Sequence, residues 1–166
     1  QCLRRESRKH VRRVILTASG GPFFRTPIEE LGRKTVDEAL RHPRWRMGRK
    51  VTVDSATMIN KGLELIEARW LFDLPPARLD VLIHPQSMVH SLVELEDGSV
   101  LAQLSATDIR LPIQYALTCP DRVPTSLPRL DLAEVGRLEF YPVEDGRYPL
   151  FAAARRALEQ GLSAPV

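Results

Sequence analysis

Cysteines, aromatic residues and long apolar runs are all scarce in this chain of 166 residues. The two cysteines, Cys2 and Cys119, are too few and too far apart for the disulfide framework of a small secreted domain, which favours a reducing, cytoplasmic location. No stretch approaches 18 consecutive apolar residues, so neither a transmembrane helix nor a membrane partner is expected. Because 43% of the residues are nevertheless hydrophobic, we expect an ordered domain with its own core rather than a disordered chain.

Internal repeats, low-complexity tracts and short nucleotide-binding motifs are absent as well. The sequence has neither a Walker A loop nor a GxGxxG fingerprint, so its residues give no support to a nucleotide-binding Rossmann half. Its length suits one ordinary domain. Gln1 stands where a complete translation product would start with Met, and we therefore expect the chain to be a piece of a longer polypeptide.

Positive charge is concentrated at the start of the chain. Residues 1–13 hold six Lys or Arg residues and one Glu, whereas the whole chain has a net charge of only +3. Such a segment can bind nucleic acid or an acidic partner, or it can be a solvated loop. The nearly neutral remainder of the chain favours the solvated loop and no nucleic-acid partner.

The hydrophobic pattern indicates both strands and helices. Short strands are expected at 14–17, 51–54 and 81–83, with a hairpin at 88–95 and 100–104. Helices are expected at 35–41 (behind a Thr35–Glu38 capping box), 55–72, 110–117 and 148–162, and residues 120–147 are rich in proline and irregular. This mixture predicts an α/β or α+β domain, in which helices cover a mixed sheet.

A turn near the start of the chain could bind an anion. Ser19, Gly20 and Gly21 follow a predicted strand, and such a turn can direct backbone N–H groups and a hydroxyl at a phosphate. An ordinary tight turn is the alternative.

The segment from Ser55 to Glu64 carries more polar chemistry. Ser55 is predicted to begin a helix, and Asn60 and Lys61 add amide and ammonium donors for a phosphate. Glu64 lies one turn beyond Asn60, where its carboxylate can bind a divalent cation beside that phosphate. The alternative is an amphipathic helix with a solvated polar face. Gly62, which costs about 1 kcal/mol relative to Ala inside a helix, indicates close packing or the close approach of a ligand.

Residues 42–50 combine a histidine with two large side chains. Trp45 and Met47 could belong to a flexible active-site loop that closes over a substrate. Equally well, they could pack into the core from an ordinary loop. His84 and His90 have no Cys or carboxylate at a zinc-like spacing, so both are predicted to be structural or supporting residues.

Four segments, taken in order, form a distinctive set: ILTASGGPF at 15–23, HP with WRMGRK within 42–50, VDSATM with NKGLE within 53–64, and LIHPQS at 82–87. Together they resemble the 1-deoxy-D-xylulose 5-phosphate reductoisomerase family. The resemblance implies an enzyme of the non-mevalonate pathway of isoprenoid biosynthesis. It would convert 1-deoxy-D-xylulose 5-phosphate to 2-C-methyl-D-erythritol 4-phosphate with NADPH and Mg²⁺ or Mn²⁺.

The resemblance also implies roles for individual residues. Glu64 would be the catalytic carboxylate that binds metal and substrate, and His42 a catalytic histidine that contacts the substrate. Trp45 would cover the substrate. The substrate, chiefly its phosphate, would be bound by Ser19, Ser55, Asn60 and Lys61. The nicotinamide side of NADPH would be approached by Met47 and Gly48.

By the same resemblance the chain divides into three parts. Residues 1–13 would be a basic linker after an absent N-terminal NADPH domain, 14–147 the catalytic domain, and 148–166 the truncated start of a C-terminal helical region. The family's Asp-Ser-Glu metal motif lies upstream of Gln1, so the chain alone is expected to be inactive. Ile109 stands where the family often has Met.

The complete enzyme is expected to be a bacterial, cytoplasmic homodimer. One alternative function is a non-catalytic sugar-phosphate-binding module that has kept the anion site. A more distant one is a basic adaptor that binds nucleic acid through its first residues.

Overall fold

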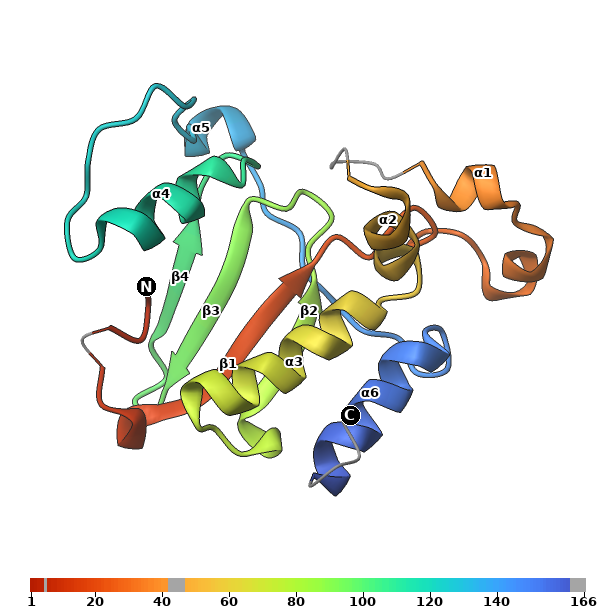
Figure 1. The fold of residues 1–166 in the computed structure, drawn as a ribbon, viewed down its shortest axis with the longest axis horizontal. Helices are drawn as coiled ribbons and strands as arrows, with labels where there is room; N and C mark the ends of the chain where they lie inside the picture. Colours follow the sequence, from red (N-terminus) through yellow and green to blue (C-terminus); the bar gives the residue numbers. More distant parts are fainter. Residues whose placement is uncertain (5, 42–46, 162–166) are drawn as a thin grey trace.

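The computed structural model describes residues 1–4, 6–41 and 47–161. Its centre is a five-stranded mixed sheet with the strand order β4-β3-β1-β2-β5 (Figure 1). In chain order the strands are β1 (Val11–Ala18), β2 (Leu79–Ile83), β3 (Val89–Leu95), β4 (Val100–Leu104) and β5 (Tyr141–Pro142). The predicted mixed sheet with helices is therefore confirmed.

The central strand, β1, joins the two halves of the sheet. It pairs in parallel with β2, where Val14 lies opposite Leu79, and antiparallel with β3. Val11 and Val14 are at most 3% exposed, as expected for a strand that has neighbours on both sides. The predicted hairpin of β3 and β4 is also present, with the Gly98 N–H donating to the Leu95 carbonyl in its turn.

Two long helices lie together beside the sheet. Helix α3 (Ile59–Phe72) packs on β1 and β2, and α6 (Pro149–Gln160) lies alongside α3 (Figure 1). A Cβ atom added at Gly62 would lie 2.4 Å from the Cβ of Ala154. The sequence left open whether Gly62 marks close packing or a ligand, and the structure shows close packing between the two helices.

The remaining helical elements are short. They are the 3₁₀ turns η1 (Arg8–His10), η2 (Ile28–Arg33) and η3 (Pro76–Arg78), and the helices α1 (Val36–Ala39), α2 (Arg49–Ala56), α4 (Arg110–Thr118) and α5 (Leu132–Val135). The predicted capping box is present at α1, because the Thr35 hydroxyl accepts from the Glu38 N–H and the Glu38 carboxylate accepts from the Thr35 N–H. No helix among the described residues is both long enough and apolar enough to cross a membrane.

The predicted strand at 51–54 is wrong, because these residues belong to α2. Their β-branched side chains favour a strand locally, but helical contacts prevail. Lys50 and Asp54 form an ion pair of 2.6 Å one turn apart, and the Thr52 hydroxyl donates to the Gly48 carbonyl. Thr52 is also buried, at 3% exposed.

The expectation that 120–147 is irregular is wrong in two places, at α5 and at β5. The Asp131 side chain accepts hydrogen bonds from the Ala133 and Glu134 N–H groups and so caps α5. Two residues of β5 pair with the end of β2. Such a short strand has no periodicity of its own and is defined by its partner.

The basic start of the chain is not solvated throughout, since residues 11–13 already belong to β1. The Arg13 guanidinium lies 2.5 Å from a Glu94 oxygen and 2.7 Å from an Asp80 oxygen. These carboxylates come from the two strands that flank β1, so the strand can begin within the basic segment. The hydrogen bond from Arg13 holds the pKa of Glu94 below its usual range.

Candidate functional site

A cavity of about 520 Å³ lies at the C-terminal end of β1, between the sheet and the α2–α3 pair. Six of the predicted site residues line it: Ser19, Met47, Ser55, Asn60, Lys61 and Glu64. Gly48 does not line the cavity. It is exposed and directly precedes α2. His42 and Trp45, with most of the predicted active-site loop, lie outside the described residues.

Ser19 follows β1 directly and enters a turn of two glycines. Gly20 and Gly21 have φ angles of +82° and +72°, and the Gly21 N–H donates to the Ser19 hydroxyl at 3.2 Å. A Cβ atom on Gly21 would lie 2.7 Å from the Ser55 carbonyl oxygen. Only glycine permits this approach, which sets the turn that begins at Ser19 against the last turn of α2.

Ser55 does not begin a helix, contrary to the prediction, but lies in the last turn of α2. Met58 then takes the left-handed conformation, with φ of +59°, and separates α2 from α3. This sharp joint turns the end of α2 and the first turn of α3 toward one cavity, so Ser55, Asn60 and Lys61 all line it. The positive end of a helix dipole at this site therefore belongs to α3.

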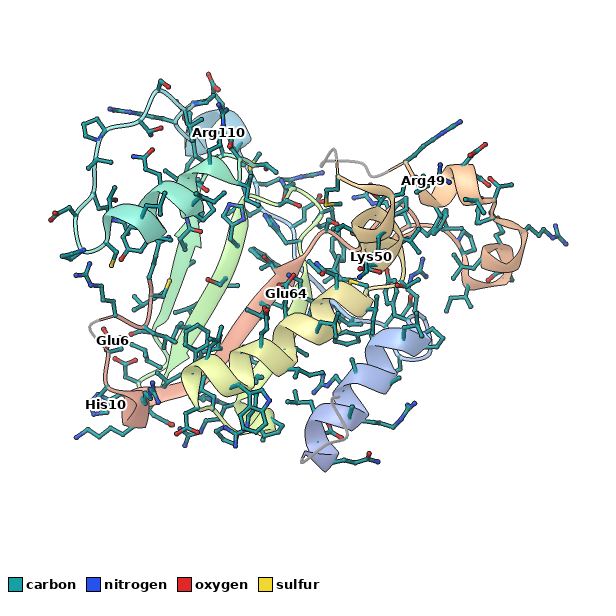
Figure 2. The ribbon with its side chains drawn as sticks, viewed as in Figure 1. Glu6, His10, Arg49, Lys50, Glu64 and Arg110 are labelled. Atoms are coloured by element: carbon teal, nitrogen blue, oxygen red, sulfur yellow. The ribbon has the colours of Figure 1, made fainter. Side chains whose placement is uncertain are left out.

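The carboxylate of Glu64 is held by two side chains of the preceding turn. Asn60 Nδ2 donates to Oε1 at 3.0 Å, which confirms the predicted i, i+4 relation, and Lys61 Nζ lies 2.5 Å from Oε2. The Lys61 side chain is only 15% exposed, so water screens this ion pair weakly. Figure 2 shows Glu64 pointing from α3 toward β1. An ammonium and an amide that can bind a phosphate thus lie beside a carboxylate that can bind a cation.

Ser87 lines the same cavity, and sequence analysis gave it no role. It is 8% exposed and has a φ of +54°, and the Thr107 hydroxyl donates to its carbonyl at 3.1 Å. Non-glycine residues in this conformation concentrate at functional sites. A signal was present: Ser87 follows β2, whose C-terminal end lies beside that of β1, and binding residues gather where parallel strands end.

His84 and His90 both make structural contacts, as predicted. His90 lines the cavity, burial lowers its pKa, and its Nε2 lies 2.9 Å from the Ser105 hydroxyl. His84 is fully buried, and its Nδ1 donates to the Glu139 carbonyl at 2.8 Å. Among the described residues, no three His, Cys, Asp or Glu side chains converge as a metal site, and Glu64 is the carboxylate in the cavity wall.

Two protein-family models match the chain. Residues 1–72 match the model described as 1-deoxy-D-xylulose 5-phosphate reductoisomerase C-terminal domain. Residues 104–166 match the model described as DXP reductoisomerase C-terminal domain.

Curated relatives match nearly all of the chain. The 1-deoxy-D-xylulose 5-phosphate reductoisomerase of Solibacter usitatus is 54% identical over 164 residues, which are 99% of this chain and 41% of that protein. The protein of the same name from Thermomicrobium roseum is 57% identical over 155 residues, 93% of this chain and 40% of that protein. The chain therefore spans about two fifths of the length of these relatives.

Solved structures share the fold. A DOX-P reductoisomerase in complex with NADPH, fosmidomycin and magnesium superposes with a TM-score of 0.87 at 46% identity, over 92% of this chain and 37% of that chain. The 1-deoxy-D-xylulose 5-phosphate reductoisomerase from Zymomonas mobilis in complex with NADPH gives a TM-score of 0.90 at 42% identity, over 99% of this chain and 42% of that chain.

Proposed function

Because this chain belongs to the 1-deoxy-D-xylulose 5-phosphate reductoisomerase family, we propose that it forms the substrate- and metal-binding part of such an enzyme. The reaction would convert 1-deoxy-D-xylulose 5-phosphate to 2-C-methyl-D-erythritol 4-phosphate with NADPH. The observation that carries this proposal is the convergence of Ser19, Ser55 and Lys61 on one cavity beside Glu64.

The phosphate of the substrate binds at the donors of this cavity. The Lys61 ammonium supplies charge, and the Asn60 amide and the hydroxyls of Ser19 and Ser55 supply hydrogen bonds. A phosphate lies away from the carbons that react, so its binding energy serves to position them. On binding, it shares Lys61 with the Glu64 carboxylate, which is already in contact with that ammonium.

Magnesium fits Glu64, because Mg²⁺ takes carboxylate oxygens and is commonly held by one or two of them together with substrate and water. Asn60 and Lys61 hold the carboxylate in one orientation toward the cavity. This chain would supply Glu64 as a ligand, and the rest would come from substrate, water or other parts of the polypeptide. When bound, the metal acts as a Lewis acid on the substrate oxygens.

This chain would form only one side of the NADPH site. Met47 and Ile109 are apolar residues of the cavity wall and suit the face of a nicotinamide ring, with Gly48 next to Met47. His42 and Trp45 are proposed to contact and cover the substrate.

We also retain the proposed division of the chain and its proposed partners. Residues 1–13 would connect to an NADPH-binding domain, and 148–166 would lead into a C-terminal region. The complete enzyme would be a cytoplasmic homodimer without a nucleic-acid or membrane partner. The ion pairs of Arg12 with Glu94 and of Arg13 with Glu94 and Asp80 support the absence of a nucleic-acid arm, because they engage these two arginines within the protein.

A graft into a complete relative tests the proposal. In this grafted protein, the chain replaces the matching segment of the Solibacter usitatus protein, and oxidation of NADPH is followed with 1-deoxy-D-xylulose 5-phosphate and Mg²⁺. We expect turnover by the grafted protein, none by the chain alone, and a fall in kcat of about 100-fold or more for Glu64→Gln. Glu67→Gln, which changes an exposed carboxylate on the same helix, is the matched control and should leave kcat unchanged.

Two outcomes would contradict the proposal. A Glu64→Gln variant with near-normal kcat would exclude the metal-ligand role. An unsubstituted grafted protein that binds the substrate but does not turn it over would favour the non-catalytic sugar-phosphate-binding module.

A further inference from the structure

Arg147 is a buried cation that does not line the cavity. Its side chain is 6% exposed, whereas that of its ion-pair partner, Glu144, is 63% exposed. Its Nη2 donates to the backbone carbonyls of Phe23, at 2.6 Å, and Thr26. Its Nε has no hydrogen-bond partner within the described part of the chain. Burial of a charge is costly, and the ion pair and the two carbonyls compensate for it except at Nε.

Tyr148 holds the same loop from the next position in the chain. It is 5% exposed, and its hydroxyl donates to the Gly20 carbonyl at 3.0 Å. The two residues that directly precede α6 therefore bind three carbonyls within residues 20–26. That loop directly follows Ser19. Side chains from outside the cavity therefore hold the backbone next to a residue of the cavity wall.

The loop, in turn, places the two serine hydroxyls of the anion site. Ser19 lies at its start, and Gly21 packs against the Ser55 carbonyl so closely that a Cβ atom would lie 2.7 Å from that oxygen. A displacement of the loop would move Ser19 and open the contact with the end of α2. Ser19 and Ser55, which both line the cavity, would then be displaced relative to each other.

Helix α6 packs closely on α3, so the residues that directly precede α6 have a fixed position. The backbone of Gly62 lies so close to Ala154 that an added Cβ atom would overlap the Ala154 side chain. Asn60, Lys61 and Glu64 are on the same helix as Gly62. Packing of α6 on α3 therefore supports the lysine side of the cavity, and Arg147 and Tyr148, directly before α6, hold the loop on its serine side.

We propose that Arg147 is a positioning residue for phosphate binding: by holding the Phe23 and Thr26 carbonyls, it keeps the Ser19 and Ser55 hydroxyls together. It sets the affinity for the phosphate group and leaves the chemical step beside Glu64 unchanged. The inference rests on the proposed function, because that function places the substrate phosphate at these hydroxyls.

Kinetics of the grafted protein test this role. Arg147→Met removes the donors, whereas Arg147→Lys keeps the charge without the planar fork that reaches both carbonyls. For Arg147→Met we expect the KM for 1-deoxy-D-xylulose 5-phosphate and the inhibition constant of inorganic phosphate to rise together by about 10-fold or more, with kcat within about threefold. Arg147→Lys should give an intermediate rise. Arg155→Met, a partly exposed arginine of α6, is the control and should change none of these constants.

Unchanged KM and phosphate inhibition in a folded Arg147→Met variant would overturn the proposal, and so would a loss confined to kcat. If Arg147→Met does not fold, Tyr148→Phe decides, because it removes one hydrogen bond from the same loop. It should raise the phosphate inhibition constant by about threefold, and no change would overturn the proposal.

An inactive grafted protein without substitutions would instead contradict the proposed function. Calorimetric titration of that protein and of Arg147→Met with inorganic phosphate then decides the role of Arg147. Weaker binding by the variant supports it, and equal binding, or binding by neither, overturns it.

Discussion

Two residues of the cavity wall, Met58 and Ser87, have left-handed backbone conformations although neither is glycine. Each such residue costs on the order of 1–3 kcal/mol and persists only where its surroundings hold it. At Ser87 the surroundings are visible, because its N–H donates to the His84 carbonyl and its carbonyl accepts from the Thr107 hydroxyl. Of the three non-glycine residues with this conformation in the described part of the chain, two therefore lie in the cavity wall, and the third, Asp73, ends α3.

Substitutions of Ser87 separate backbone strain from the loss of its hydroxyl. Ser87→Gly and Ser87→Ala both remove the hydroxyl, but only glycine adopts a φ of +54° without strain. We expect the glycine variant to be more stable than the alanine variant by about 1 kcal/mol in the free energy of unfolding. Urea denaturation of both variants measures this difference, and equal stabilities would show that the site imposes no strain.

The half-buried His90 predicts a dependence of stability on pH. Burial lowers its pKa from the usual value of 6.5, so the unfolded chain binds a proton more readily than the folded one. The free energy of unfolding should therefore fall as the pH drops below about 6.5, until the pKa of the folded state is passed. Denaturant titrations between pH 5 and 8 should show a shallower fall for His90→Gln than for the unsubstituted chain. Parallel curves would exclude this role.

At the scale of elements, patterns that are local in sequence predict most strands and helices. They do not predict where one helix ends and the next begins. The strands β1 to β4, the hairpin and the capping box follow from neighbouring residues, whereas β5 and the helix at 51–54 do not. The break between α2 and α3 lies at Thr57 and the left-handed Met58, inside the helical pattern that the sequence shows from residue 55 to 72. Apolar periodicity in α3 also misleads, because Leu63, Trp70 and Leu71 are exposed, whereas Leu65 and Ala68 are buried.

The candidate site shows the same division between local and distant information. The contact of Asn60 with Glu64 follows from helical spacing, so the sequence predicts it. Ser87 joins the cavity only through the pairing of β2 with β1. Arg147 reaches a loop more than a hundred residues away in sequence, and no local pattern reports such a contact.

The contact between α3 and α6 gives a prediction about Gly62. Replacing glycine by alanine inside a helix is normally stabilising, yet here the new Cβ would overlap Ala154. We expect Gly62→Ala to lower the free energy of unfolding by about 1–3 kcal/mol. Ala154→Gly should recover part of that loss in the double variant, because it removes the overlapping atom. A stable Gly62→Ala variant, seen by chemical denaturation, would show that the helices can move apart at little cost.

At the scale of the whole molecule, large apolar side chains remain exposed on two helices. On α3 these are Trp70 and Leu71, and on α4 they are Ile113 and Leu117, the last at 82% exposed. Exposed apolar side chains in groups indicate surfaces that another polypeptide covers. Helix α4 follows the edge strand β4, whose Val100 is also exposed (Figure 1).

This surface leads to a prediction about association. If the complete enzyme is a homodimer that uses α4 and β4, the chain should sediment at about twice its mass of 18.8 kDa at micromolar concentration. Leu117→Asp should shift the equilibrium toward the monomer, and Trp70→Asp, on the other helix, is the control. A monomer at every concentration, measured by analytical ultracentrifugation, would contradict a dimer interface on α4 and β4.

The order of the strands along the chain has a consequence for the newborn polypeptide. The central strand β1 is synthesised first, but its partners begin only at Leu79 and Val89. Both edges of β1 are open templates for pairing with other chains until β2 has been made, and the edge that pairs with β3 stays open until residue 95. Arg12 and Arg13 lie within this vulnerable strand, and like charges on neighbouring nascent chains repel one another. The basic residues that begin the sheet would thus protect the chain from aggregation before they find their carboxylate partners.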